Sequence, residues 1–273
     1  LLVLFKNQFV AREQIFKSLK GNLFSFPGIL RRLLNPAKSF SKSLAQILAV
    51  DIDLHRRLHR FLITPKNETT FTELQVGVDA LSVVVPTSND WATCLTTEEL
   101  GAIWGADSTV SSWNQVRAGF PDVAIDLYGP GTDSGTFDFF NEEITEDLGG
   151  SRSDYTASED DNVLVNGVSG SAGGLGYFGL AYYEENKDKL TAVQVDAGDG
   201  CQPPEAAFEG NYFLARPLFI YIAESAKGMS AVREFVDFYF VAMDAIVPAV
   251  GYVPMLAEQK MASLMSWSAF SRG

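Results

Sequence analysis

The chain has 273 residues, which suits one large domain or two small lobes, and its 47% hydrophobic content is ample for a core. No uninterrupted apolar run reaches the roughly 18 residues that a membrane-spanning helix needs. The net charge of −13 hides an asymmetry: residues 1–70 hold 12 Lys and Arg against 4 Asp and Glu, whereas residues 71–273 hold 9 against 30. This shift predicts a boundary near residue 70, and the acidic part is expected to repel nucleic acid.

Residues 1–70 have the pattern of basic amphipathic helices, interrupted at Pro27 and Pro36. Acidic residues are almost absent before Asp51, which is typical of a transit peptide or of a helix that lies on a membrane surface. The same composition also fits unrelated sequence from a faulty gene assembly. His55 and His59 are four residues apart, and we interpret them as part of a solvated helical face rather than as a metal site.

From Phe71 onward, strand and helix patterns alternate. Residues 71–85 carry strand signals, first alternating and then continuously apolar, and Pro86 ends them. Residues 95–100 begin a helix with a predicted capping box between Thr96 and Glu99. The same periodicities predict later strands and helices, with strands at 124–128, 192–195 and 218–222 and helices at 158–168, at 180–190 and from Ser230. This alternation predicts an α/β fold with parallel strand pairing.

The segment from Gly129 to Thr136 joins the predicted strand at 124–128 to the start of a helix. The hydroxyl groups of Ser134 and Thr136 are expected to converge with the first free N–H groups of that helix, where the helix dipole also favours an anion. No Gly-Lys-Ser/Thr ending follows, so the loop is not a nucleotide-binding P-loop. The alternative interpretation is a glycine-rich turn with a Ser or Thr cap.

Several classes of active site are disfavoured by the residue types present. Residues 71–273 contain no histidine, so neither a serine nor a cysteine nucleophile has a histidine base there. The acidic residues are spread along helix starts, and the glycines at 173–179 lack dinucleotide-binding spacing. We therefore expect no enzyme, no metal and no cofactor. The two cysteines, Cys94 and Cys201, fit either one disulfide in an oxidising compartment or two free buried thiols.

Several segments between about residues 71 and 258 follow one another in the order found in a known family. They are Asp90-Trp91, Ser112-Trp113-Asn114-Gln115-Val116, Leu127-Tyr128-Gly129-Pro130-Gly131-Thr132-Asp133-Ser134-Gly135-Thr136-Phe137-Asp138, Ser158-Glu159-Asp160-Asp161-Asn162-Val163-Leu164-Val165 and Arg216-Pro217-Leu218-Phe219-Ile220-Tyr221. In these segments the chain resembles the phosphate-binding protein of bacterial phosphate ABC transporters, the PstS-like family. Residues 1–70 do not share the resemblance.

The resemblance implies a two-lobe periplasmic-binding-protein-like α/β fold, in which hinge strands join the lobes and the lobes close on phosphate. Residues 86–204 would form the second lobe, and residues 71–85 and 205–273 a partial first lobe with the hinge. The implied function is a solute-binding protein that captures inorganic phosphate for uptake, with the membrane permease of a phosphate ABC transporter as its partner. A monomer in the periplasm or at the cell surface is expected, secreted or lipid-anchored.

The family's anion loop maps onto Ser134, Gly135 and Thr136, which the loop pattern also marks. Some family members carry an arginine four residues before that serine, where this chain has Pro130. The positive charge must then come from elsewhere in the chain.

Arg152 is the candidate for that charge, because an arginine fork suits two phosphate oxygens. The alternative for Arg152 is a surface ion pair with Asp154 or Glu159. By the same resemblance Cys94 and Cys201 fall near the two ends of the second lobe, so a disulfide between them is expected.

The sequence departs from the family in its opening part. Family members begin with a strand that ends in a Gly-Ser-Ser-Thr-like loop, and a Ser-Arg-Pro-like segment follows later; together these supply the other half of the phosphate shell. Neither motif occurs in residues 1–70. The first lobe is therefore expected to be incomplete, with the strand at 218–222 and the helix after Ser230 short of partners. Two alternatives follow: a relic that does not bind, or an interaction protein with a basic, membrane-associating N-terminal region.

Overall fold

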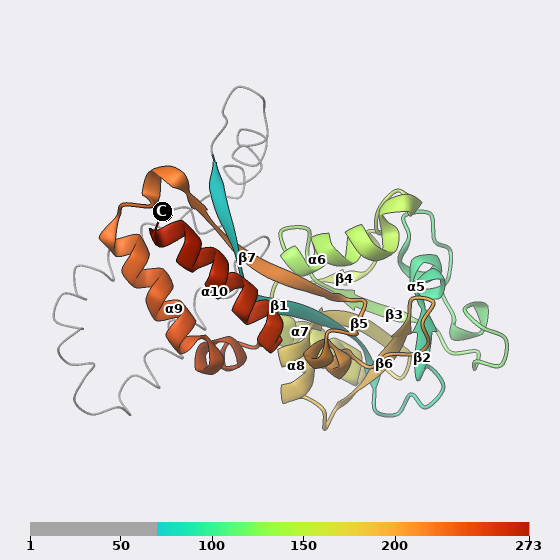
Figure 1. Ribbon diagram of the computed structural model, residues 1–273. Coiled ribbons are helices and arrows are strands. Elements are labelled where there is room, and N and C mark those ends of the chain that lie inside the picture. Colours follow the sequence, from blue (N-terminus) through green and yellow to red (C-terminus); the bar gives the residue numbers. More distant parts are fainter. Residues whose placement is uncertain (1–69, 273) are drawn as a thin grey trace.

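The computed structural model describes residues 70–272, and Figure 1 shows how their helices and strands are arranged. The predictions made for residues 1–69, namely the basic helices, the face with His55 and His59 and the membrane-associating region, lie outside the described residues. The described part is a mixed α/β structure, as the sequence predicts.

One long strand, β1 (Phe71–Pro86), runs through both halves of the molecule (Figure 1). Its first part pairs with β7 (Ala215–Ala223), and its second part pairs with β5 (Gly174–Gly179) and β6 (Leu190–Asp196). The continuous apolar run at the end of β1 is therefore buried between two neighbours, as predicted for such a run.

The predicted parallel pairing holds for only part of the sheet. The strand β3 (Asp126–Gly129) is parallel to β5 and to the short β4 (Thr156–Ala157), and β2 (Cys94–Thr96) is parallel to β6. The pairings of β1 with β5, β6 and β7 are antiparallel, and the strand order is β2-β6-β1-β5-β3-β4 with β7 beside β1. The prediction is wrong for β1 and β7 because these two strands carry the chain between the halves in opposite directions.

The helices lie on both sides of this pair of crossover strands (Figure 1). In chain order they are α5 (Thr97–Trp104), α6 (Gly135–Phe140), α7 (Asp161–Gly170), α8 (Leu180–Glu185), α9 (Ser230–Ala249) and α10 (Ala257–Arg272). A π-helical turn, Asn141–Thr145, continues α6, and short 3-10 turns lie at Trp113–Gln115, Glu146–Leu148, Pro204–Glu209 and Glu224–Ala226. The helix predicted at 180–190 ends at Glu185, since Leu190 already begins β6.

Two separate cores correspond to the two halves. The larger half is built around the buried residues Trp104, Trp113, Tyr177 and Phe178 and contains β2–β6 with α5–α8. The smaller half packs the start of β1 and β7 against α9 and α10. Because β1 contributes to both cores, the halves are covalently and structurally joined along one strand.

The apolar face of β7 has partners in the smaller half. Its inward-facing residues Leu218, Ile220 and Ile222 are buried in a cluster with α9 and with Trp267 of α10, a helix that the sequence analysis did not predict. The inner face of β7 is therefore packed, whereas along its edge β7 pairs with β1 alone, which is consistent with the expected incomplete first lobe. The outer face of α9 remains open, with Phe238 55% and Val241 84% exposed.

The capping box predicted at the start of α5 is present, whereas α9 starts without a side-chain cap. Thr96 and Glu99 form the predicted capping box: Glu99 N donates to Thr96 Oγ1 at 3.2 Å, and Thr96 N donates to Glu99 Oε2 at 3.0 Å. The helix α9 begins at Ser230, as predicted, with Met229 at its N-cap position and no side-chain cap. Along one face of α9, Val232, Val236, Phe240, Met243 and Val247 recur at helical spacing and are buried.

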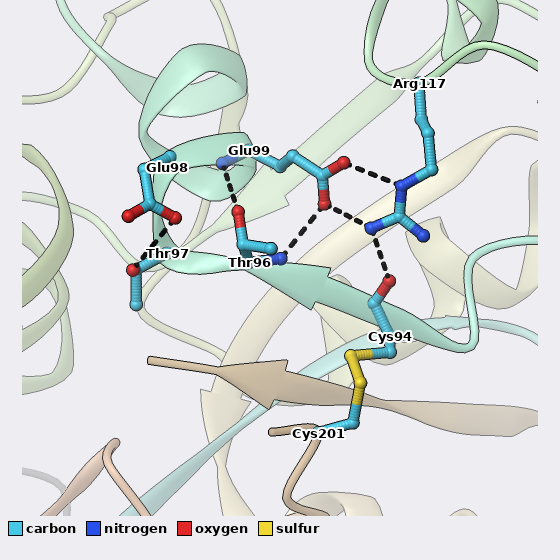
Figure 2. A network of polar contacts seen from close by, with 7 residues as sticks. All are labelled: Cys94, Thr96, Thr97, Glu98, Glu99, Arg117 and Cys201. Atoms are coloured by element: carbon cyan, nitrogen blue, oxygen red, sulfur yellow. Dashed lines mark hydrogen bonds and ion pairs between the residues drawn. A yellow bond between two sulfur atoms is a disulfide. The ribbon is translucent and has the colours of Figure 1, made fainter. Parts of the chain in front are cut away.

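Cys94 and Cys201 form the expected disulfide, which ties β2 to the segment after β6 (Figure 2). Next to it, Arg117 holds Glu99 in a fork of two hydrogen bonds, at 2.7 and 2.5 Å, and also donates to the Cys94 carbonyl oxygen at 3.2 Å. The capping box, the ion pair and the disulfide therefore form one connected structure at this edge of the larger half. Within residues 70–272, none of the helices combines the length and apolar character needed to cross a bilayer.

Candidate functional site

A small cavity of about 50 Å³ lies beside the anion loop, where the two halves meet. Its walls come from five parts of the chain: the end of the β1–β7 pairing, the loop before α6, the segment that leads into α7, the start of α8, and the turn after α9. The polar side chains in these walls include Asp79, Ser134, Thr136, Glu159 and Asp161. The cavity is therefore built by residues far apart in the sequence, at the junction of the two halves.

The predicted anion loop brings Ser134, Gly135 and Thr136 together at this cavity. Ser134 is the N-cap of α6, and its hydroxyl oxygen accepts a hydrogen bond from Thr136 N at 3.2 Å. The Ser134 and Thr136 side chains both line the cavity, while Gly135 is buried at the first position of the helix. The helix cap by Ser134, which was the alternative interpretation of this loop, is therefore present. Ser134 and Thr136 nevertheless also line the cavity.

Aromatic side chains of the larger half support the anion loop. Tyr155 Oη donates to the Pro130 carbonyl oxygen at 2.7 Å. The rings of Phe140 and Tyr177 stack with centroids 3.9 Å apart, and Trp104 meets both of them edge-on. These buried rings leave the loop little freedom to move, which preorganises its donors.

Arg152 lies away from the cavity and is engaged by the chain itself. Its Nε and Nη2 atoms donate to the two carboxylate oxygens of Asp154 at 2.5 and 2.8 Å, and Nη1 donates to the carbonyl oxygens of Ile103 at 3.1 Å and Val110 at 2.9 Å. The ion pair also raises the pKa of Arg152. Arg152 is not among the residues that line the cavity, and the ion pair with Asp154 that was its alternative role is formed.

Carboxyl groups form one wall of the cavity. Burial, with the nearby charges of Asp160 and Glu159, raises the pKa of Asp161 to about 7. Burial and the charge of Asp133 also raise the pKa of Glu159, against a hydrogen bond from the backbone of Asp133. An anion is therefore bound more easily here when these carboxyl groups carry protons.

A buried ion pair closes the back of the site. Arg216 Nη2 lies 3.1 Å from Asp79 Oδ2, and both side chains are nine-tenths buried or nearly so, at 12% and 10% exposure. Burial raises the pKa of Asp79, although the charge and hydrogen bonds of Arg216 oppose the rise. Arg216 also donates to the carbonyl oxygen of Gly135 at 3.1 Å, which connects the pair to the anion loop.

Sequence reasoning did not mark Asp79, Arg216, Glu159 or Asp161 as site residues. The sequence did contain a sign of the ion pair between Asp79 and Arg216. Asp79 is a charged residue within an apolar strand, and Arg216 lies two residues before the apolar run that starts at Leu218. Asp161 was interpreted only as part of a helix start, and Glu159 as part of that start or as an ion-pair partner of Arg152. In the part of the chain that the structure describes, no group of three His, Cys, Asp or Glu side chains is placed to hold a metal ion.

The chain matches one protein-family model, described as a PBP superfamily domain, over residues 36–242. The match covers most of the chain and begins within the segment that carries no resemblance on its motifs alone. Among solved structures, a possible phosphate binding protein from Planctomyces limnophilus aligns with a TM-score of 0.68 and 42% identity, over 74% of each chain.

Two curated proteins show the same likeness. Protein SphX of Synechocystis is 48% identical over 198 residues, which cover 70% of this chain and 59% of SphX. Phosphate-binding protein PstS of Staphylococcus haemolyticus is 33% identical over 189 residues, which cover 67% of this chain and 58% of that protein. The chain therefore spans less than two thirds of the length of these relatives.

Proposed function

Because the chain belongs to the PBP superfamily, we propose that it captures inorganic phosphate at the cavity beside the anion loop. The observation that carries this proposal is the position of Ser134, Gly135 and Thr136, which stand together at a cavity between the two halves. Hydroxyl and backbone N–H donors at the start of a helix suit an oxyanion. The names of the relatives, a phosphate-binding protein and a possible phosphate binding protein, point to the same ligand.

The protein would act as the solute-binding component of a phosphate ABC transporter and pass phosphate to its membrane permease. A binding role, not catalysis, fits the residues at the cavity, where no histidine stands among the lining side chains. The disulfide supports a periplasmic or cell-surface location, because such bonds persist in oxidising compartments. We propose a monomer, with no nucleic acid among its partners.

The loop donors, and not Arg152, carry the binding in this proposal. The Arg152 guanidinium would reach phosphate only by leaving Asp154 and the carbonyl groups of Ile103 and Val110. The loss of those contacts would cost more than an exposed ion pair does, since the Arg152 side chain is only 12% exposed.

Calorimetric titration of the full chain with phosphate, with sulfate as the control anion, tests the proposal. Phosphate-selective binding is expected, and Thr136→Val should weaken it by about tenfold, because the substitution removes a hydroxyl and keeps the shape. Thr191→Val is the matched control, since Thr191 lies on β6 and outside the cavity. A folded wild-type protein that binds neither anion would refute the proposal and favour a relic.

A further inference from the structure

The ion pair of Asp79 and Arg216 stands where the two sheets of the molecule separate. The two residues are direct cross-strand partners in the β1–β7 ladder, and the ladder ends one pair later, at Ala80 and Ala215. From Leu81 onward β1 pairs with β5 in the larger half. A charge pair at this position connects the two crossover strands at the point where they leave one half for the other.

The guanidinium of Arg216 contacts the anion loop as well as its ion-pair partner. Nε and Nη2 donate to Asp79 Oδ2 at 3.3 and 3.1 Å, and Nη2 also donates to the Gly135 carbonyl oxygen at 3.1 Å. The guanidinium carbon lies 4.5 Å from the centre of the Phe139 ring, which belongs to α6. Arg216 is therefore fixed from three sides by β1, by the loop and by the helix that follows it.

The contact with Gly135 fixes the peptide unit that holds the Ser134 hydroxyl at the cavity. The carbonyl group of Gly135 and the N–H group of Thr136 belong to the same planar peptide unit, so a donor that fixes the carbonyl oxygen also fixes the direction of that N–H. The N–H donates to the hydroxyl oxygen of Ser134, which lines the cavity, so a fixed peptide unit also fixes that hydroxyl. The positive charge of the guanidinium beside the carbonyl oxygen further polarises the peptide unit and strengthens its N–H as a donor to Ser134. Arg216 does not line the cavity itself, so it acts on an anion through this peptide unit.

We infer that Arg216 is a positioning residue, which orients the Gly135–Thr136 peptide unit for an anion and links that unit to the crossover strands. The inference rests on the proposed function for its effect on phosphate, but the contact with the loop exists without any ligand. A lysine in its place would keep the charge and lose the fork, because a single ammonium group cannot hold Asp79 and Gly135 in the same planar geometry.

Hydrogen exchange of the full chain without phosphate, combined with calorimetric titration, tests the inference. Arg216→Lys should speed amide exchange in the peptide over residues 134–140 by tenfold or more and weaken phosphate binding by about tenfold. Arg117→Lys is the matched control, because Arg117 forms an ion pair with Glu99 (Figure 2) and is not among the residues that line the cavity. The control should leave both quantities within twofold of the wild-type values.

A second variant separates the loop contact from the ion pair. Asp79→Asn removes the opposite charge and keeps Arg216 beside the Gly135 carbonyl oxygen, so exchange over 134–140 should stay near the wild-type rate. The inference is overturned if Arg216→Lys leaves that exchange unchanged, or if Asp79→Asn speeds it as much as Arg216→Lys does. A wild-type protein that binds no phosphate, with Arg216→Lys still loosening the loop, would refute the proposed function and leave the positioning role standing.

Discussion

The carboxylate of Glu159 occupies the space beside Gly131 that any larger side chain would need. A Cβ atom at Gly131 would lie only 2.1 Å from Glu159 Oε1. Glu159 also lines the cavity, so the absence of a side chain at position 131 determines where one acidic wall of the site stands.

Gly131→Ala should therefore displace the Glu159 carboxylate, but it should change the free energy of unfolding by only about 0.5 kcal/mol or less, because this carboxylate is the far end of an exposed and flexible side chain. Urea denaturation measures the change. Gly228→Ala is the control, because a Cβ at Gly228 meets no atom within 4 Å. A clear loss of stability relative to this control would show that Glu159 does not move aside freely.

Asp161 should make the stability of the protein fall as the pH rises. Its folded-state pKa of about 7 lies above the ordinary value of 3.8, so between these two pH values the folded state holds a proton that the unfolded chain has already released. Stability is then fully kept below about pH 4 and declines up to about pH 7. Asp161→Asn should remove this decline and stabilise the protein at pH 8 by on the order of 3 kcal/mol, with little effect at pH 4.

Thermal unfolding of the wild type and Asp161→Asn at both pH values measures this effect. Asp188→Asn serves as the control, since Asp188 is exposed on the loop before β6. If Asp161→Asn stabilised the protein equally at pH 4 and pH 8, the loss of stability at high pH would not come from ionisation of the Asp161 carboxyl group.

Loss of the Cys94–Cys201 disulfide should destabilise the protein by about 3–5 kcal/mol. The two cysteines are 107 residues apart, and a cross-link over a loop of that size strongly restricts the unfolded chain. Chemical denaturation of the double variant Cys94→Ser/Cys201→Ser measures the cost. A reductant should destabilise the wild type and leave the double variant unchanged; equal sensitivity of both would mean that the reductant acts elsewhere.

Arg152→Lys should affect stability and spare phosphate binding. The lysine loses the fork to Asp154 and the bonds to the Ile103 and Val110 carbonyl groups, at a cost of about 1–3 kcal/mol in the free energy of unfolding. Phosphate affinity should stay within twofold, since Arg152 is outside the cavity lining. A tenfold weaker affinity at unchanged stability would instead put Arg152 in the binding site, as the family resemblance implies.

The parts of the fold that depend on nearby residues could be predicted from the sequence. The capping box of Thr96 and Glu99 spans three residues, and the cap of Ser134 on Thr136 spans two, so their chemistry is visible in a short stretch. The buried face of α9 follows from the helical repeat of its apolar residues. These features need no knowledge of the rest of the chain.

The parts that depend on strand pairing could not be predicted in this way. Asp79 and Arg216 are 137 residues apart and meet only because β1 and β7 are antiparallel in one particular register. The same pairing brings Arg216 to Gly135, 81 residues away. The contacts of Arg152 with Ile103 and Val110 could not be predicted for a similar reason, because these partners lie more than 40 residues earlier, whereas its ion pair with Asp154 is local and was named as the alternative.

The strand β1 has a consequence for how the molecule comes apart. This strand of 16 residues places Leu74 and Val76 in the core of the smaller half, and Ala80, Leu81 and residues 83–85 in the core of the larger half. Neither half can lose its sheet without disturbing a strand that the other half needs, so partial unfolding of one half is penalised by the other. Heat or denaturant should therefore melt the described structure in a single cooperative transition, and a protease that cuts within β1 would disable both halves at once.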